Sequence, residues 1–216
     1  MALKLKGSTS GFTAIDAPAT AGDNTLVLPA DNGSASQYLQ TDGSGVLSWA
    51  TVTDTTTNLT RGTVVAATSG TTITFTGIPA TARKITMILD QVSLSGGDTV
   101  QARIGDSGGI ETTGYDYKAF FLHTGNYGSS VYTSGFGFRW ESTAGHRSGH
   151  FELYNITGNV WVGKHLLGTF AETQTSGVSA GAGRKELSDT LTQIQLTSVG
   201  GTQTFDNGQV NVMWEV

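Results

Sequence analysis

The chain contains no cysteine, few charged residues and no long hydrophobic run. The absence of cysteine excludes a disulfide framework and any zinc site built on thiolates. No apolar stretch approaches the ~20 residues that cross a bilayer as a helix, so we expect no membrane insertion. Residues 1–11 (MALKLKGSTSG) lack the apolar core of a cleaved signal peptide. We therefore expect a protein that is made in the cytoplasm and stabilised by packing or by association.

Charged residues make up only 13 % of the 216 residues, and the formal net charge is −5. No basic stripe is present that could neutralise a phosphate backbone, so nucleic acid is not an expected partner. The phosphate-binding pattern GxxxxGK[ST] and the dinucleotide fingerprint GxGxxG are also missing from the sequence. These absences predict a protein without a cofactor.

Glycine (30 residues) and threonine (34 residues) are abundant instead. Threonine suits a pleated, half-buried surface, and glycine suits the turns between strands. Aromatic residues recur up to the end of the chain, which is not typical of disorder. Helical periodicity is nearly absent, and only residues 184–191 (RKELSDTL) are compatible with one helical turn. The composition predicts an all-β protein.

The chain divides into two parts, residues 1–60 and residues 61–216, which differ in the length of their apolar segments. Long alternating segments in the second part predict about eight to ten strands of a β-sandwich, jelly-roll-like, with turns at 157–159 and 206–208. The expected strands are Thr71–Thr76, Arg83–Leu94, Thr99–Ile104, Tyr115–Leu122, Phe136–Trp140, His150–Ile156, Val160–Phe170, Gln193–Val199 and Gln209–Val216.

Residues 1–60 form an extended segment of short predicted strands and turns that ends in a polar linker at residues 51–63. Burial of a large apolar side chain contributes roughly 1.5–3 kcal/mol, whereas ordering the backbone costs ~1–2 kcal/mol per residue. The large apolar residues are too few to order this segment, so we expect them to anchor it on another copy, a larger assembly or the second domain. The candidate anchors are Leu3, Leu5, Phe12, Ile15, Leu26, Leu28, Tyr38, Leu39, Leu47 and Trp49.

The string GDSGG at residues 105–109 matches the sequence around the nucleophile of chymotrypsin-like proteases. Those enzymes place the catalytic histidine and aspartate before the serine, whereas all four histidines of this chain follow Ser107. We therefore interpret the string as a glycine-rich turn after the strand that ends at Ile104.

His146 and His150 have the spacing of two zinc ligands on one face of a helix. Gly145 and Gly149 and the strand that follows argue against a helix, so we predict no metal site. The acidic residues lie mostly in turns, where their side chains bond the backbone, and no pair marks a glycosidase. The sequence predicts no catalytic residues and no enzyme.

Residues 114–150 are rich in aromatic side chains and histidine. Alternating members fit a core, whereas exposed members suit contact with a protein or a sugar. Both interpretations remain open. The candidate contact residues in this segment are Tyr115, Tyr117, Tyr127, Tyr132 and His146.

Three strings in the first part follow one another: APATAGDNTLVLPA (17–30), NG (32–33) and YLQTDGSGVLSW (38–49). Together they resemble a module, covering residues 5–52, that recurs in tail fibres and other structural proteins of tailed bacteriophages, many of which infect cyanobacteria. The second part resembles the β-sandwich tips of tail fibres and tailspikes. That likeness rests on FTGIP (75–79), QARIGDSGGIETT (101–113) and GTQTFDNG (201–208), while residues 115–189 are variable.

The resemblance implies a virion protein that forms a homotrimer. Such modules occur in capsid cement (decoration) proteins, which bind the major capsid protein, and in receptor-binding tips of tail fibres or tailspikes. A chain of 216 residues that starts with Met and lacks a long shaft favours a cement protein on the capsid surface. Its knob would face outward, where loops can contact a host surface glycan. A glycan-degrading enzyme is a further alternative.

Overall fold

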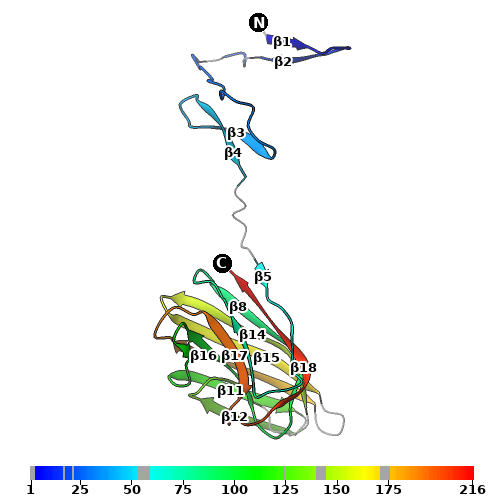
Figure 1. Cartoon of the computed structure of the whole chain (residues 1–216), viewed down its shortest axis with the longest axis vertical. Helices are drawn as coiled ribbons and strands as arrows, with labels where there is room; N and C mark the ends of the chain where they lie inside the picture. Colours follow the sequence, from blue (N-terminus) through cyan, green and yellow to red (C-terminus); the bar gives the residue numbers. More distant parts are fainter. Residues whose placement is uncertain are drawn as a thin grey trace. The chain divides into compact units, whose positions relative to one another are not determined.

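The computed structural model describes residues 3–16, 18–20, 22–52, 59–123, 125–139, 145–170 and 176–216. The chain is all-β, as predicted: these residues form eighteen strands and no helix, and therefore none that could cross a membrane. Two compact units are present, Met1–Thr56 and Thr57–Val216, both drawn in Figure 1. The second unit starts before the predicted boundary, because strand β5 (Leu59–Arg61) pairs with β18 (Phe205–Glu215).

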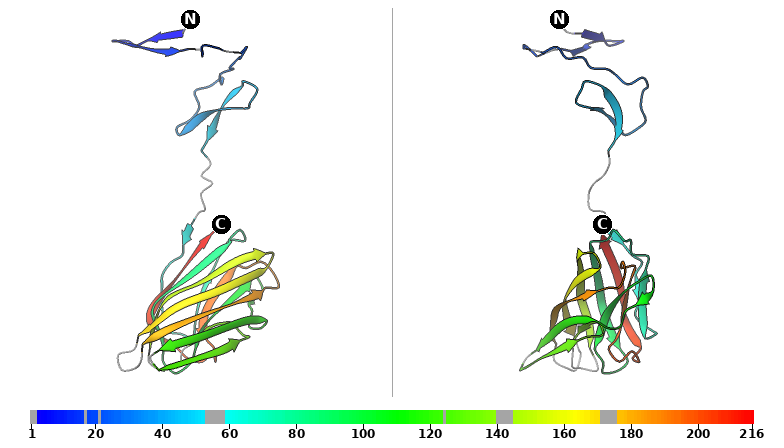
Figure 2. Two further views of the ribbon diagram at one scale, coloured as in Figure 1. Left: turned by 180° about the vertical axis from the view of Figure 1, so that it is seen from behind. Right: turned by 90° about the vertical axis from the view of Figure 1, so that its left-hand side faces the viewer.

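The second unit is β-sandwich-like and consists of two antiparallel sheets (Figure 2). The larger sheet has the strand order β12-β11-β16-β15-β14-β8-β18-β5, with β6 also paired to β18. Its remaining strands are β6 (Val65–Ala66), β8 (Lys84–Leu94), β11 (Tyr115–His123), β12 (Asn126–Tyr132), β14 (His146–Thr157), β15 (Val160–Phe170) and β16 (Gly177–Glu186).

The smaller sheet has the order β10-β9-β17-β7, with β13 paired to β9. Its strands are β7 (Thr72–Thr76), β9 (Val100–Asp106), β10 (Gly109–Ile110), β13 (Phe136–Phe138) and β17 (Gln193–Ser198). The core lies between the two sheets, because side chains alternate along each strand and one set from each sheet is buried. Met87 and Phe151 of the larger sheet and Ile104, Phe136 and Leu196 of the smaller sheet are completely buried.

The expected strands of the second unit match the observed ones within a few residues, apart from the strand at 150–156, which starts at His146, and the last one. The hairpin at 157–159 is confirmed, since β14 and β15 pair up to Thr157 and Val160. Trp140 and residues 53–58 of the predicted linker lie outside the described residues. The predicted helical turn at 184–191 is wrong, because β16 continues through Glu186 and a bend follows.

The predicted turn at 206–208 is also wrong. Strand β18 already starts at Phe205, and its pairing with β8 shifts register twice, between Phe205 and Asn207 and between Asn207 and Gln209. Gly208 has a φ of +95°, as a bulge often requires. The segment therefore stays within the sheet as an irregularity instead of reversing the chain.

The first unit contains two separate hairpins and connecting turns. Strands β1 (Leu3–Lys6) and β2 (Phe12–Ile15) form one hairpin, and β3 (Gln37–Thr41) and β4 (Leu47–Thr51) form the other. An isolated parallel bridge joins Val27 to Val46, the residue before β4. Two-stranded hairpins are marginally stable in water, so this unit has little intrinsic stability.

Candidate functional site

The first unit is the candidate functional site because none of its described residues is buried. Among the ten candidate anchors, Leu47 and Trp49 are half-buried and the other eight are exposed. The exposed fractions are 60 % for Leu3, 55 % for Leu5, 62 % for Phe12, 63 % for Ile15, 66 % for Leu26, 70 % for Leu28, 46 % for Tyr38 and 45 % for Leu39. The anchors thus have no core of their own to fill.

The hairpin of β1 and β2 has one apolar face. Leu3 lies opposite Ile15, and Leu5 lies opposite Thr13, so these side chains project to the same side. Phe12 lies on the other side, where the Lys4 ammonium sits 4.6 Å from the centre of its ring. The apolar side has no described neighbour that covers it, as the exposures above 50 % for Leu3 and Ile15 show.

The hairpin of β3 and β4 owes its turn to local polar contacts. The Asp42 carboxylate accepts hydrogen bonds from the N–H groups of Ser44 (2.7 Å) and Val46 (3.1 Å). Gly45 has a φ of +96°, and a side chain there would collide with the carbonyl oxygen of Thr25. These polar and backbone contacts hold the turn at residues 42–45 (DGSG), which does not depend on the burial of apolar side chains.

Trp49 is an anchor that is held by contacts within the first unit. Its indole N–H donates to the carbonyl oxygen of Asp31 (3.0 Å), and Gly33 lies directly against the ring. The indole borders an open hollow of about 540 Å³ whose lining includes Pro29 and Leu47. A partner side chain could enter this hollow and contact the indole, which is an amphipathic group suited to interfaces.

Most candidate contact residues of the second unit are not available to a ligand. Tyr115, Tyr117 and Tyr132 are 3 %, 1 % and 8 % exposed, so they belong to the core, which is one of the two interpretations that the sequence leaves open. They lie within strands, on the side that faces the core. Tyr127 is 83 % exposed, and His146 is half-buried, with its Nδ1 3.0 Å from the Asn207 amide nitrogen.

The string GDSGG forms the glycine-rich turn that the sequence predicts. Gly105 and Asp106 end β9, and Gly109 starts β10 with a φ of +127°. The Asp106 carboxylate accepts the Gly108 N–H at 2.7 Å. No hydrogen bond links Ser107 to a histidine within the described part of the chain, so the turn lacks the pairing of a serine nucleophile with its base.

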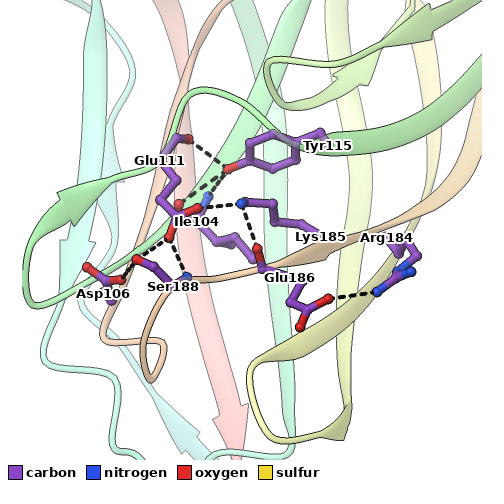
Figure 3. A network of polar contacts seen from close by, with 8 residues as sticks. All are labelled: Ile104, Asp106, Glu111, Tyr115, Arg184, Lys185, Glu186 and Ser188. Atoms are coloured by element: carbon purple, nitrogen blue, oxygen red, sulfur yellow. Dashed lines mark hydrogen bonds and ion pairs between the residues drawn. The ribbon is translucent and has the colours of Figure 1, made fainter.

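Asp106 instead belongs to a polar network that ties this turn to the segment after β16 (Figure 3). The Ser188 hydroxyl lies 2.7 Å from Asp106 Oδ2 and 2.9 Å from Glu111 Oε1. Glu111 also forms an ion pair with the buried Lys185. The Ser188 hydroxyl and the Gly108 N–H lower the pKa of Asp106. These bonds favour ionised carboxylates that join the two sheets.

Tyr115 completes this network. Its hydroxyl accepts a hydrogen bond from the Ile104 N–H and lies 2.9 Å from the Glu111 carbonyl oxygen, to which it can donate. Burial raises the pKa of Tyr115 above its usual value, so the phenol stays protonated. Burial also raises the pKa of Glu111, but the ion pair with Lys185 and the bonds from Ser188 outweigh it, and the net change is downward.

A second buried network connects Tyr117, His165 and Ser179. The Tyr117 hydroxyl lies 2.6 Å from His165 Nδ1, and Ser179 Oγ lies 2.8 Å from His165 Nε2. Burial lowers the pKa of His165 to about 3, so the ring is neutral at pH 7. Ser179 is 2 % exposed, so this arrangement holds the core together and is closed to a substrate.

The outer face of the larger sheet carries a row of paired charges. Lys84 Nζ lies 2.9 Å from Glu215 Oε1 and 3.8 Å from Glu152 Oε1, and Lys164 Nζ lies 3.0 Å from Glu152 Oε2. Burial raises the pKa of Glu152, but the bonds with Lys164 outweigh it, and the pKa falls. Within the described residues, no three His, Asp or Glu side chains gather in a way that could hold a metal ion.

Comparison with protein-family models, with curated proteins and with solved structures found no match to this chain. Function therefore has to be argued from the residues themselves. Sequence reasoning found the exposed anchors of the first unit but missed an apolar patch on the second unit. One part of the signal lies in β11, where Phe120, Phe121 and Leu122 are consecutive, so that both faces of the strand carry a large apolar side chain. The rest of the patch depends on the order of the strands in the sheet, which the sequence does not show.

Proposed function

We propose that this chain is a structural protein of a virion, a capsid cement protein that binds the shell through its first unit. One observation carries the proposal: the described first unit forms two hairpins, yet buries none of its residues. Such a segment gains stability only against a second surface. The resemblance of residues 5–52 to a module of tailed-phage structural proteins, which includes capsid cement proteins, supports the major capsid protein as that surface.

The hairpins offer two kinds of contact to the shell. Leu3, Leu5 and Ile15 supply an apolar side that can be buried. The sheet of β1 and β2 has two strands in the described structure, so each has an edge with unpaired backbone groups. A strand of the shell can pair there through main-chain hydrogen bonds. In the proposed homotrimer three first units bind together, and the effective concentration multiplies weak contacts.

A second candidate function is the receptor-binding tip of a tail fibre or tailspike, with a host surface glycan as ligand. The 83 % exposure of Tyr127 favours it, because an exposed aromatic ring suits stacking on a sugar. A glycan-degrading activity has less support. The resolved pKa shifts of Asp106, Glu111 and Glu152 are all downward, whereas a general acid needs a raised pKa.

The anchoring role is tested with a triple variant of the full chain, Leu3→Ser, Leu5→Ser and Ile15→Ser. We expect binding to empty shells of the encoding phage, measured by co-sedimentation, to weaken at least about 100-fold, because three buried apolar contacts are lost. The matched control is Ile156→Ser, which changes a side chain of the second unit with 62 % exposure. Unchanged binding of the triple variant would refute the anchoring role.

Imaging of purified virions separates the two candidate functions. A cement protein should occupy many sites over the head, with density for residues 3–52 on the shell. A receptor-binding tip should be present in a few copies at the tail. The second result would overturn the cement assignment and direct attention to Tyr127 and its neighbours.

A further inference from the structure

The larger sheet has a continuous apolar patch on the face that points away from the core. It is formed by neighbouring strands β12, β11, β16 and β15, which lie side by side in Figure 2. We call this patch the outer apolar face. Its residues and their exposed fractions are Phe120 (50 %), Leu122 (57 %), Tyr127 (83 %), Val131 (64 %), Leu166 (52 %) and Val178 (43 %).

The pairing register of the four strands places these side chains next to one another. Leu122 lies opposite Tyr127 on one side and opposite Val178 on the other. Phe120 is two residues along the same strand, and its row continues through Ala180 to Leu166. Side chains directly opposite in antiparallel strands have Cβ atoms about 4.5–5.5 Å apart. The residues therefore form one surface and not scattered exposed positions.

This surface is unusual for a sheet that meets water. An antiparallel sheet with one solvated face normally alternates apolar and polar residues. In β11 the buried side already carries Tyr117 and Phe121, yet the other side carries Phe120 and Leu122. A large contiguous apolar patch of this kind marks an interaction site.

The size of the patch fits association between proteins. At about 150–200 Å² for a fully exposed large side chain, the six residues together expose on the order of 600 Å². Each partner contributes about 600 Å² or more to a specific interface. The patch alone reaches that lower limit, before its surroundings are counted.

The charges nearby favour a second copy of the same chain as the partner. Among the described strand pairs, Lys118 lies opposite Val131 and His150 lies opposite Leu166, and no Asp, Glu or Arg lies directly opposite a member of the patch. The adjoining charges of Lys164 and Glu152 are already paired within the chain. The outer apolar faces of neighbouring copies can therefore approach one another without strong like-charge repulsion, which would otherwise disfavour self-association.

We propose that copies of this chain associate through the outer apolar face, which packs against a neighbouring copy. The proposal deepens the proposed function, whose homotrimer needs such a surface. It is independent of what the first unit binds. In a closed trimer the outer apolar faces of three copies would converge on the three-fold axis, where each face buries its apolar side chains against its neighbours.

The first test measures association of the purified full chain by sedimentation velocity over a range of concentrations. We expect the wild type to associate, and the variant Phe120→Thr, Leu122→Thr, Leu166→Thr to have a dissociation constant at least about 100-fold higher. Threonine keeps the preference for strands. The control is Ile156→Thr. Ile156 lies on β14, six residues beyond His150, the residue opposite Leu166, and this variant should associate like the wild type.

A second test avoids disrupting the surface. The chain has no cysteine, so Val131→Cys carries a single thiol in the patch, and Ile156→Cys carries one of similar exposure outside it. We expect maleimide to label Val131→Cys slowly at high protein concentration and at least about tenfold faster after dilution. Labelling of Ile156→Cys should not depend on concentration.

Each outcome decides the proposal. A wild-type chain that stays monomeric, or one that associates as strongly after the threonine substitutions, would overturn it. Fast labelling of Val131→Cys at every concentration would do the same. Shell binding is measured separately, with the Leu3, Leu5 and Ile15 variant, so failure of the outer apolar face and failure of the anchoring role give different results.

Discussion

At the residue scale, the alternation in β11 (YDYKAFFLH, Tyr115–His123) shows what can be predicted from a sequence and what cannot. The period of two correctly predicts a strand, but apolar residues occupy both sets of positions. A shift of one residue exchanges the buried and exposed faces. The sequence therefore could not tell whether Tyr115 and Tyr117 or Phe120 and Leu122 face the core. The contacts of the two tyrosine hydroxyls with Ile104 and His165 show which set is buried.

His165 gives a residue-scale prediction about pH. Its pKa is about 3 in the folded chain, because of burial, and about 6.5 when unfolded. Between these values the unfolded chain binds a proton that the folded chain does not. The free energy of unfolding should therefore fall as pH drops below 6.5, by up to about 1.4 kcal/mol per pH unit. Above pH 6.5 this contribution should be constant.

Urea unfolding between pH 7 and pH 4 measures this dependence. His165→Gln should be less stable than the wild type at pH 7 and should have a smaller slope with pH. Ile156→Gln is the control, since Ile156 is exposed and carries no titrating group. Its slope should equal that of the wild type. If His165→Gln also kept the full slope, buried His165 would not be the titrating group.

At the element scale, strands were easier to predict than their connections. Residues 71–76 and 83–94 were found almost to the residue because alternation is a local signal. The segment Asp206–Gly208 was predicted as a turn because Asn-Gly favours positive φ. A bulge in a strand has the same local requirement. Only the pairing of β18 with β8, which are far apart in the chain, distinguishes the two.

The bulge also gives an element-scale prediction. Gly208 has a φ of +95°, and a Cβ atom there would lie 2.5 Å from the Asp90 carbonyl oxygen. Gly208→Ala should therefore lower the free energy of unfolding by about 2–4 kcal/mol, through strain and collision together. Gly201→Ala is the control, because Gly201 has a φ of +71° and no other atom within 4 Å of its Cβ position. Strain alone should cost about 1 kcal/mol there. If urea unfolding showed the same decrease in the free energy of unfolding for both variants, a contribution from the collision would be excluded.

At the scale of the whole molecule, the lack of a core in the first part could be predicted by counting large apolar residues. The outer apolar face could not. Its members come from β11, β12, β15 and β16, and become neighbours only when the sheet order is known. Exposed apolar anchors can therefore be predicted from a sequence when they belong to a short segment with too few large apolar residues to form a core. A patch assembled across a sheet is not.

The two units should differ in how strongly their backbone is protected from hydrogen exchange. In the free chain we expect amides of β1 to β4 to exchange close to the rate of an unfolded peptide, since their hairpins bury no residue. Amides of β8, β14 and β15 should be protected by many orders of magnitude, because they lie in the interior of the larger sheet. Mass spectrometry after exchange measures both sets in one sample. Shell binding should then slow exchange in β1 to β4 and leave β14 unchanged. Strong protection of β1 to β4 in the free, monomeric chain would show that the first unit is stable by itself, and the physical argument for anchoring would fail.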